Sequence, residues 1–385
     1  MAKKRYMDRL ARTGSIGLMY PIGPGISPGS DTSHLAILGY DPYKYYTGRG
    51  ALEAVGAGIT LNPGEIAFRC NFATVDNNMI VIDRRVKPTP EERTDFALTI
   101  NKLNLGYPKI SLRFVPTVGH RAILILRGEG ISRRVSDTDP HVEGRAVQRS
   151  TPWDDGEDSE HTADFMNEFT ARSHLALKEH PANKERIKRG LPPVNVILSR
   201  GPGTIPPIQT LTAKYSITAA CVAVVPVVRG ICRLAGMNLI DVQGATGGLD
   251  TDYAAKADAA IAAMKEHDLV LLHIKAPDVA SHYGDLEKKV WTIERIDEAV
   301  KRILESLDLN TCYVVLTSDH ATPVTVRDHS ADPVPILIAG PDFDESETPT
   351  FSEKTAAAGN LGTLCALNLM PILMSRLGKT GKFGS

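Results

Sequence analysis

Apolar and polar positions follow two different rhythms along this chain, and the change between them predicts its elements. In the second half, apolar runs such as Leu269–Ile274 and Tyr313–Leu316 have the length and composition of short buried strands. Amphipathic stretches of helical period, Asp250–His267 and Asp285–Leu307, precede them. Helix and strand in this order and at these lengths are typical of an α/β fold with a mainly parallel sheet covered by helices.

An earlier part of the chain has a different pattern, in which strands follow one another closely. Apolar runs at Ile66–Thr74 and Met79–Ile82 flank the turn residues of a hairpin, and a helix is predicted over Thr89–Leu103. Two further strands are predicted at Ile110–Val115 and Arg121–Leu126. This run indicates a smaller inserted α+β domain. We expect a larger domain from residues 1–62 and 206–385 and an inserted domain from residues 63–205.

Two more apolar stretches, Ala219–Ala235 and Leu361–Leu377, are predicted to be mostly helical, and Val194–Leu198 and Val334–Ala339 to be strands. The longest apolar run, Ile217–Val228, is too short to span a membrane and is interrupted by a proline.

The composition excludes several classes of protein. The chain has 385 residues, 42% of them hydrophobic, which argues against disorder. Lys and Arg number 44 and Asp and Glu 45, so no nucleic-acid or membrane surface is indicated, and basic clusters are expected to serve a small anion. Five scattered cysteines without a CxxC pair are typical of a reduced, cytoplasmic protein, and the basic N-terminus MAKKRYMDRL lacks the apolar segment of a signal peptide.

A turn rich in glycine and proline, Pro21–Ser33, places Ser30 after a glycine at the predicted start of a helix. The series Ser30-Asp31-Thr32 suits the N-cap, and the helix is expected to continue to Leu38. Free N–H groups and the helix dipole favour a hydroxyl that loses its proton and attacks phosphorus. From the turn alone, plain N-capping is the more common role of such a serine.

Asp and His side chains follow two predicted strands at their carboxyl ends, where open α/β sheets bind ligands. Asp278 and His282 are four residues apart, so they face the same way if this segment is helical. Asp319 and His320 follow the second strand, and His329 lies in a polar turn beyond. Such ligands suit Mn²⁺, Zn²⁺, Co²⁺ or, less well, Mg²⁺. Core histidines and helix caps explain each pair alone, but together the residues predict one or two metal ions, a pair of which would assist phosphoryl transfer.

Basic side chains recur in the inserted domain, mostly at strand ends. They are Arg69, Arg84, Arg85, His120 and Arg121, with His141 in an acidic loop and Arg200 directly after the strand Val194–Leu198. Arginines gathered in this way bind a phosphate or a carboxylate. A solvated surface is the alternative, and it stays open because spacing does not place these residues on one face.

The segments around these candidates resemble a known family. DVASH followed by TSDHATP and RDHS resembles the alkaline phosphatase superfamily, and the match is best to its archaeal-type 2,3-bisphosphoglycerate-independent phosphoglycerate mutases. Essentially the whole chain follows that family's order, through blocks that include PGSDTSHLAILGYDP, FRCNFATVD, VIDRR, GHRAIL, DPHVEG, LSRGPGT, QGATGG and DHSADPVPILIAG. The resemblance implies a three-layer, alkaline-phosphatase-like core with a mainly parallel sheet and an inserted α+β domain.

The resemblance also implies an isomerase of glycolysis and gluconeogenesis that interconverts 3-phosphoglycerate and 2-phosphoglycerate. Ser30 matches the nucleophile that takes the phosphoryl group, after which the bound glycerate reorients and its 2-hydroxyl takes the group back. The implied partner is a small phosphorylated glycerate in the cytoplasm, and assembly into a homo-oligomer is left open.

Further site residues are carried over from the same resemblance. Asp278, His282 and His329 match the ligands of one divalent ion, and Asp319, His320 and Ser30 match those of a second. The inserted domain would hold the substrate through His120, Arg121, His141 and Arg200, with Arg84 and Lys275 as further candidates.

One departure from the family keeps other activities open. The family begins with a strand ending in Leu-Asp-Gly, whose Asp completes the second metal site, and no Asp-Gly precedes Ser30 here. We expect this strand and ligand to be missing from the sequence, by truncation or by loss. A phosphatase or phosphonate hydrolase of the same superfamily shares the metal site, and a non-catalytic member would bind metal or a phosphosugar without turnover.

Overall fold

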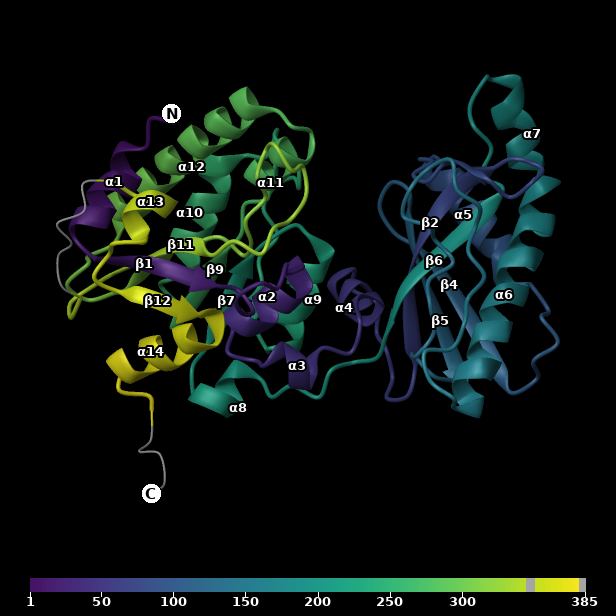
Figure 1. The fold of residues 1–385 in the computed structure, drawn as a ribbon, viewed down its shortest axis with the longest axis horizontal. Coiled ribbons are helices and arrows are strands. Elements are labelled where there is room, and N and C mark those ends of the chain that lie inside the picture. Colours follow the sequence, from purple (N-terminus) through teal and green to yellow (C-terminus); the bar gives the residue numbers. More distant parts are fainter. Residues whose placement is uncertain (344–349, 381–385) are drawn as a thin grey trace. The chain divides into compact units, whose positions relative to one another are not determined.

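The computed structural model describes residues 1–343 and 350–380 of the chain, which divide into two compact units (Figure 1). Unit 1 comprises Met1–Tyr46 and Pro207–Ser385, and unit 2 comprises Thr47–Pro206. The expected domain limits at residues 62/63 and 205/206 remain a proposal. The contacts divide the chain at Thr47 instead of near residue 62, because helix α4 (Arg49–Gly56) packs against the strands of unit 2.

Unit 1 is a mixed α/β body. Its helices are α1 (Arg5–Arg12), α2 (Ser30–Ile37), α3 (Pro42–Tyr45), α8 (Leu211–Tyr215), α9 (Pro226–Leu234), α10 (Tyr253–Ala263), α11 (Ala276–His282), α12 (Leu286–Ser306), α13 (Glu353–Ala356), η1 (Ala366–Asn368) and α14 (Leu369–Arg376). Its strands are β1 (Ser15–Tyr20), β7 (Ala219–Val222), β8 (Asn238–Leu239), β9 (Leu269–Leu272), β10 (Val314–Leu316), β11 (Val334–Ala339) and β12 (Gly362–Cys365).

The strands of unit 1 form two hydrogen-bonded sheets. One has the order β8-β7-β9 and is parallel, as the helix–strand alternation predicts. The other has the order β10-β11-β1-β12 and is mixed, since β11 runs antiparallel to both β10 and β1. The expectation that each strand ending in ligands lies in a parallel sheet is therefore wrong for β10. β10 pairs with β11 antiparallel, and the connection between them contains no helix of the kind that usually joins parallel strands.

Two of the predicted helices of unit 1 begin as strands. Ala219–Val222 pairs in parallel with Leu269–Leu272, and helix α9 starts only at Pro226, where a proline is tolerated at the first helical position. Gly362–Cys365 likewise forms β12 beside β1, before η1 and α14. Periodicity does not separate a short buried strand from a helix within one apolar run, and here the strand is stabilised by its neighbour.

Unit 2 is an α+β body built around one sheet. Its helices are α4, α5 (Pro90–Ile100), α6 (Glu157–Lys178) and α7 (Pro181–Lys188), and its strands are β2 (Ile66–Val75), β3 (Val81–Asp83), β4 (Ile110–Pro116), β5 (Arg121–Gly128) and β6 (Val196–Gly203). The strands pair antiparallel in the order β3-β2-β5-β4, with β6 on β2. The α+β character predicted for this part of the chain is what the structure contains.

Strand β2 is buried along its whole length because both of its faces are covered. Phe68, Cys70 and Phe72 belong to a core with residues of α5 and α6, which lie on one side of the sheet in Figure 1. The alternate residue Arg69 points to the opposite face, where it meets Glu53 of α4. This alternation keeps the apolar core and the charged residues on separate faces.

No helix among the described residues has the length and apolar character that a membrane crossing requires.

Candidate active site

Ser30 lies at the first position of α2. The helix begins one residue earlier than the N-cap role predicted for this serine, because Gly29 occupies the N-cap and its carbonyl accepts from the Ser33 N–H at 3.0 Å. The side chain of Ser30 is therefore not used for capping. Its hydroxyl Oγ instead lies 3.1 Å from Nε2 of His320, a residue 290 positions away in the sequence.

The structure brings the five predicted ligands and Ser30 together within unit 1. Asp278 and His282 lie on α11, one turn apart, with 3.2 Å between Oδ1 of Asp278 and Nε2 of His282. His329 Nε2 lies 3.7 Å from the same Asp278 oxygen, and its ring stacks on His320 with 3.6 Å between centroids. The short helix predicted after the first strand is present and sets the Asp278–His282 spacing.

Two of these histidines are held in one tautomer by backbone carbonyls. Nδ1 of His282 donates to the carbonyl of Arg327 at 2.8 Å, and Nδ1 of His329 donates to the carbonyl of Pro28 at 2.8 Å. A carbonyl only accepts, so in the neutral ring the proton lies on Nδ1 and the lone pair on Nε2. Histidines that bind metals are oriented in this manner.

The lone pairs of these rings face a carboxylate, and this is the test of whether the residues fit a metal ion. Asp278 Oδ1 meets Nε2 of both His282 and His329, so groups that only accept lie against each other. A divalent cation coordinated by all three would turn this repulsion into attraction, and imidazole with carboxylate is a donor set that such ions take. The residues present fit a divalent metal ion.

The described residues contain three sets of potential ligands, each with its ligand atoms within 4.8 Å of one another. They are Asp278 with His320 and His329, His282 with Asp328 and His329, and Asp319 with His34 and His273. This grouping differs from the two sets expected from the family resemblance, since His320 joins Asp278 and His329 through the stacked rings. His34, His273 and Asp328 were not among the ligands predicted from the sequence.

His34 is a neighbour of Asp319 that had a detectable signal, because it follows Ser30 by one helical turn. Its Nδ1 donates to the carbonyl of Ser30 at 2.8 Å and lies 3.6 Å from Oδ2 of Asp319. The nitrogen nearest Asp319 therefore carries a proton, and this polar N–H group of His34 stabilises the negative charge of the Asp319 carboxylate. His273, directly after β9, packs edge-on against His34 at 5.3 Å.

The electrostatics of this site lower the pKa of Asp319 and of two buried histidines, His320 and His273. Burial would raise the pKa of Asp319, but the neighbouring His320, His34 and His273 hold it below its ordinary value. Burial lowers the pKa of His320 to about 4 and that of His273 to about 3. Neutral imidazoles and ionised carboxylates are the protonation states that bind a metal.

Lys275 also contacts this site. Its ammonium donates to Oδ2 of Asp278, the carboxylate oxygen that does not face the histidines. Burial would raise the pKa of Asp278, but the charge and hydrogen bond of Lys275 lower it. In the structure Lys275 thus acts on a proposed ligand, while its predicted role in substrate binding stays a prediction.

In unit 2 a buried carboxylate is surrounded by arginines. Glu53, with 3% of its surface exposed, accepts from Arg49 Nε at 2.8 Å and lies 3.1 Å from Arg69 Nε and 3.9 Å from Arg121 Nη1. Burial would raise the pKa of Glu53, and the three arginines lower it. One carboxylate does not balance three guanidinium groups, so this cluster has an excess of positive charge. Arg49 and Glu53 were missed because helical spacing gives no sign of their partners on β2 and β5.

A second group in unit 2 centres on the buried carboxylate of Asp139. Arg84 binds it with two hydrogen bonds, from Nε at 2.9 Å and from Nη2 at 2.7 Å. Arg200 Nε lies 3.8 Å from the same carboxylate, and its Nη1 lies 3.4 Å from Nδ1 of His141. His141 Nε2 meets Asp137 at 2.9 Å. Arg84 is thereby committed to Asp139, and Arg200 is the less tightly paired of the two predicted anion binders.

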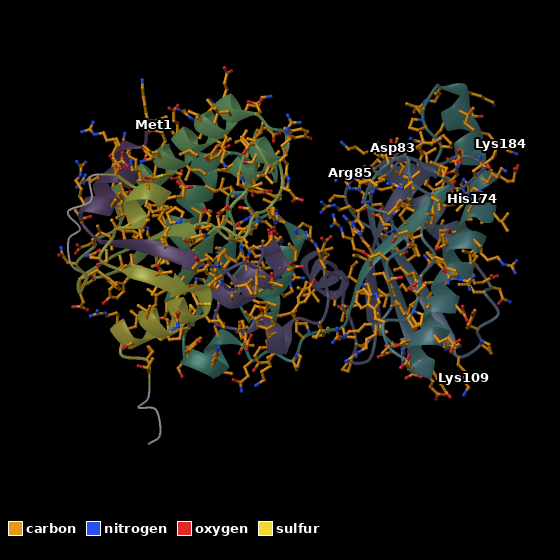
Figure 2. The ribbon with its side chains drawn as sticks, in the orientation of Figure 1. Met1, Asp83, Arg85, Lys109, His174 and Lys184 are labelled. Carbon is orange, nitrogen blue, oxygen red and sulfur yellow. The ribbon has the colours of Figure 1, made fainter. Side chains whose placement is uncertain are left out.

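His120 lies close to the positively charged side chains of unit 2. Burial, together with the charges of Arg121 and Arg69, lowers its pKa to about 3. Arg85, drawn in Figure 2 beside Asp83 after β3, contributes in the same direction. His120 is therefore neutral at pH 7, so it can offer a hydrogen bond to an anion but no charge.

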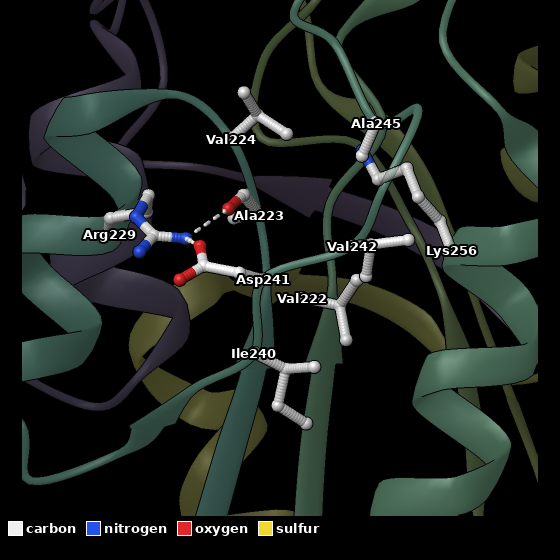
Figure 3. A pocket seen from close by; sticks show the side chains of 9 residues that line it. All are labelled: Val222, Ala223, Val224, Arg229, Ile240, Asp241, Val242, Ala245 and Lys256. Atoms are coloured by element: carbon white, nitrogen blue, oxygen red, sulfur yellow. Dashed lines mark hydrogen bonds and ion pairs between the residues drawn. The ribbon is translucent and has the colours of Figure 1, made fainter.

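A separate cavity of about 230 Å³ lies in unit 1 by the carboxyl ends of β7 and β8 (Figure 3). Arg229 projects from α9 and donates to the carbonyl of Ala223, and it pairs with Asp241 at 2.8 Å. Lys256 of α10 is buried, donates to the carbonyl of His273 and has a pKa lowered by burial to about 8. This hydrogen bond from Lys256 stabilises the end of β9, and α11 with its proposed metal ligands follows directly in the sequence.

Comparison with known sequences identifies similar proteins. The profile described as 2,3-bisphosphoglycerate-independent phosphoglycerate mutase matches residues 11–183, and that of type I phosphodiesterase / nucleotide pyrophosphatase matches residues 144–334. The 2,3-bisphosphoglycerate-independent phosphoglycerate mutase 1 of Methanothermobacter thermautotrophicus is 45% identical over 381 residues, covering 98% of this chain and 92% of that protein. The Pyrobaculum aerophilum mutase is 46% identical over 389 residues, covering 100% and 94%.

Solved structures agree with the sequence matches. A Pyrococcus horikoshii protein superposes with a TM-score of 0.84 and 34% identity, covering 100% of this chain and 92% of that one. The cofactor-independent phosphoglycerate mutase of Thermoplasma acidophilum gives a TM-score of 0.67 and 34% identity, covering 97% and 92%.

Proposed function

The chain belongs to the 2,3-bisphosphoglycerate-independent phosphoglycerate mutase family, and on this premise we propose how its residues perform the reaction. It is an isomerase that interconverts 3-phosphoglycerate and 2-phosphoglycerate, a step of glycolysis and gluconeogenesis. The proposal concerns the residues: Ser30 is the nucleophile, the Asp and His residues of unit 1 hold divalent ions, and the basic residues of unit 2 bind the substrate anion.

The observation that carries the proposal is the hydrogen bond between Ser30 Oγ and His320 Nε2 at 3.1 Å. It places the hydroxyl of a helix N-terminus against a neutral imidazole, next to the ionised Asp319. Ser30 Oγ attacks phosphorus of 3-phosphoglycerate, the bond from phosphorus to the C3 oxygen breaks, and the proton that Ser30 loses is balanced by the one that the departing oxygen gains. The 2-hydroxyl of the retained glycerate then attacks the phosphoserine and the bond from phosphorus to Ser30 Oγ breaks; the 2-hydroxyl loses a proton and Ser30 Oγ regains one, which gives 2-phosphoglycerate and the free serine.

Divalent ions fit the ligand groups of unit 1 and supply the positive charge that favours an ionised serine and stabilises the transferring phosphoryl group. We assign Asp278, His282 and His329 to one ion and Asp319 and His320, with Ser30, to a second. Mn²⁺, Co²⁺, Zn²⁺ and Mg²⁺ are the candidates by ligand chemistry.

The substrate anion is bound by unit 2 in this proposal. Arg121, Arg200, His120 and His141 are the binding residues carried from the sequence, and the excess of guanidinium groups around Glu53 and Asp139 supports them. Planar guanidinium groups suit both the phosphate and the carboxylate of phosphoglycerate. Arg84 and Lys275 are proposed to act through Asp139 and Asp278, their tightly bound partners. The three-layer architecture and the domain limits near residues 62 and 205 belong to the same proposal.

A direct assay tests this function. The purified chain is given 3-phosphoglycerate with Mn²⁺ or Co²⁺ and without 2,3-bisphosphoglycerate, and both 2-phosphoglycerate and free phosphate are measured over time. The proposal predicts 2-phosphoglycerate with little phosphate. Free phosphate without 2-phosphoglycerate would instead indicate a hydrolase, in which the glycerate leaves before it can accept the group back.

A further inference from the structure

The side chain of Thr322 links the two groups of proposed metal ligands. Thr322 follows His320 by two residues and is buried, with 7% of its surface exposed. Its hydroxyl oxygen lies 3.0 Å from Nδ1 of His320 and 2.9 Å from Oδ1 of Asp278. One hydroxyl therefore contacts a ligand assigned to each ion.

The direction of the two hydrogen bonds that join His320, Thr322 and Asp278 can be deduced by starting from the carboxylate of Asp278. An ionised Asp278 only accepts, so the single hydroxyl proton of Thr322 is donated to it. The oxygen of Thr322 must then accept from Nδ1–H of His320. This leaves the lone pair of His320 on Nε2, the nitrogen that meets Ser30 Oγ at 3.1 Å.

We propose that Thr322 is a positioning residue that fixes the tautomer of His320 and thereby couples the binding of the two ions. The inference rests on the proposed two-ion site. His282 and His329 obtain the same tautomer from backbone carbonyls, whereas His320 obtains it from a side-chain hydroxyl that is itself oriented by Asp278. Any change at Asp278 is consequently transmitted to His320.

The loop around Thr322 is built to hold this position. The carbonyl of Thr322 accepts from Lys289 of α12 at 2.9 Å, and its neighbour Ala321 forms a bridge with Ser330 across the turn. Without the hydroxyl, Nδ1 of His320 would lose its acceptor at a buried position. The ring would then be free to carry its proton on Nε2, and in that form Nε2 does not bind a metal ion.

Three variants separate this role from a structural one. Thr322→Val keeps the shape and removes the hydroxyl, Thr322→Ser restores it, and Thr317→Val removes the hydroxyl of a threonine that bonds to the Pro335 carbonyl near the same strand end. Co²⁺ is titrated into each protein, and the bound ion is followed by equilibrium dialysis and by its visible absorption spectrum. Thermal unfolding of the metal-free proteins is recorded in parallel.

We expect Thr322→Val to bind the ion assigned to Asp319 and His320 about 10- to 100-fold more weakly, with an altered Co²⁺ spectrum. Thr322→Ser and Thr317→Val should match the wild type. Wild-type affinity and spectrum in Thr322→Val would overturn the inference, as would equal weakening in Thr322→Ser or in Thr317→Val. A wild-type protein that binds no Co²⁺ would contradict the proposed function itself, which distinguishes the two failures.

Discussion

The two units of this protein carry functional groups of opposite character. In unit 1, imidazole lone pairs face the carboxylate of Asp278, so acceptors meet acceptors. In unit 2, three guanidinium groups surround Glu53, so donors exceed acceptors. The first arrangement calls for a cation and the second for an anion. The proposed metal-assisted transfer of an anionic phosphoryl group uses both, and each unit is proposed to provide one of them.

The comparison also shows how each site is held in place. His282 and His329 of unit 1 are oriented by backbone carbonyls, which do not change with the side chains around them. The arginines of unit 2 are oriented by buried carboxylates, so removing a carboxylate disturbs the fold as well as the site. Variants in the two units are therefore expected to fail in different ways.

The largest effect is expected from removing the nucleophile in unit 1. Ser30→Ala should lower kcat by about 10⁴-fold or more, because no other hydroxyl takes its place at His320 Nε2. Metal binding and thermal unfolding should change little, and steady-state kinetics with metal analysis measure both. Ser33→Ala on the same helix is the control, since the Ser33 hydroxyl has no hydrogen-bond partner among the residues that the structure describes. Substantial mutase activity in Ser30→Ala would contradict the assignment.

The second-largest effect is expected in unit 2, and it is a loss of folding stability where the change in unit 1 is a loss of activity. Glu53→Gln should lower the free energy of unfolding by about 3–5 kcal/mol, since it leaves buried arginines without their counter-charge. The pKa of Glu53 is lowered by those arginines, so its contribution is present at neutral pH and is lost as pH falls through this depressed pKa. Chemical denaturation measures the change. Glu129→Gln is the control: it removes an exposed ion pair with Lys109 and should lower the free energy of unfolding by less than about 1 kcal/mol.

In unit 1 the loss of a carboxylate should act through the metal. Asp278→Asn is expected to lower metal affinity and mutase activity by at least about 100-fold, and to do so without the large loss of stability expected for Glu53→Gln. Excess Mn²⁺ or Co²⁺ should restore part of the activity. Asp258→Asn, at an exposed ion pair on α10, is the control. Normal metal content in Asp278→Asn would remove the basis for calling this a metal site.

Much of this comparison is visible in the sequence, and the remainder depends on contacts. Asp278 and His282 are predictable because a strand followed by one helical turn fixes their spacing. His34 has a weaker signal, its spacing of one helical turn from Ser30, and His273 has none, since it meets His34 and Asp319 only when β9 and α2 have packed. Ala219–Val222 was expected to be helical because its pairing with β9 cannot be seen in one apolar run. Arg69 was noticed as a basic residue, but its partner Glu53 emerges only from the packing of α4 on β2.

The smallest effect is expected on substrate binding, and it distinguishes the roles of Arg200 and Arg84 in unit 2. Arg200→Ala should raise KM for 3-phosphoglycerate about 10- to 150-fold, the value of a charged hydrogen bond of about 1.5–3 kcal/mol, and Arg200→Lys should rescue little because it lacks the planar fork. Arg84→Ala should instead lower stability, because it leaves Asp139 buried without its two hydrogen bonds. Kinetics and denaturation of both variants provide the test. Equal changes in KM would show that Arg84 contacts the substrate too.

The central claim is that Ser30 carries the phosphoryl group between the two positions of the glycerate. The most direct measurement is mass spectrometry of the protein quenched with acid during turnover of 3-phosphoglycerate, followed by peptide mapping. The account predicts one added phosphoryl group on the peptide that contains Ser30, and none in Ser30→Ala. Turnover with no phosphorylated peptide, or with the group on another residue, would contradict it.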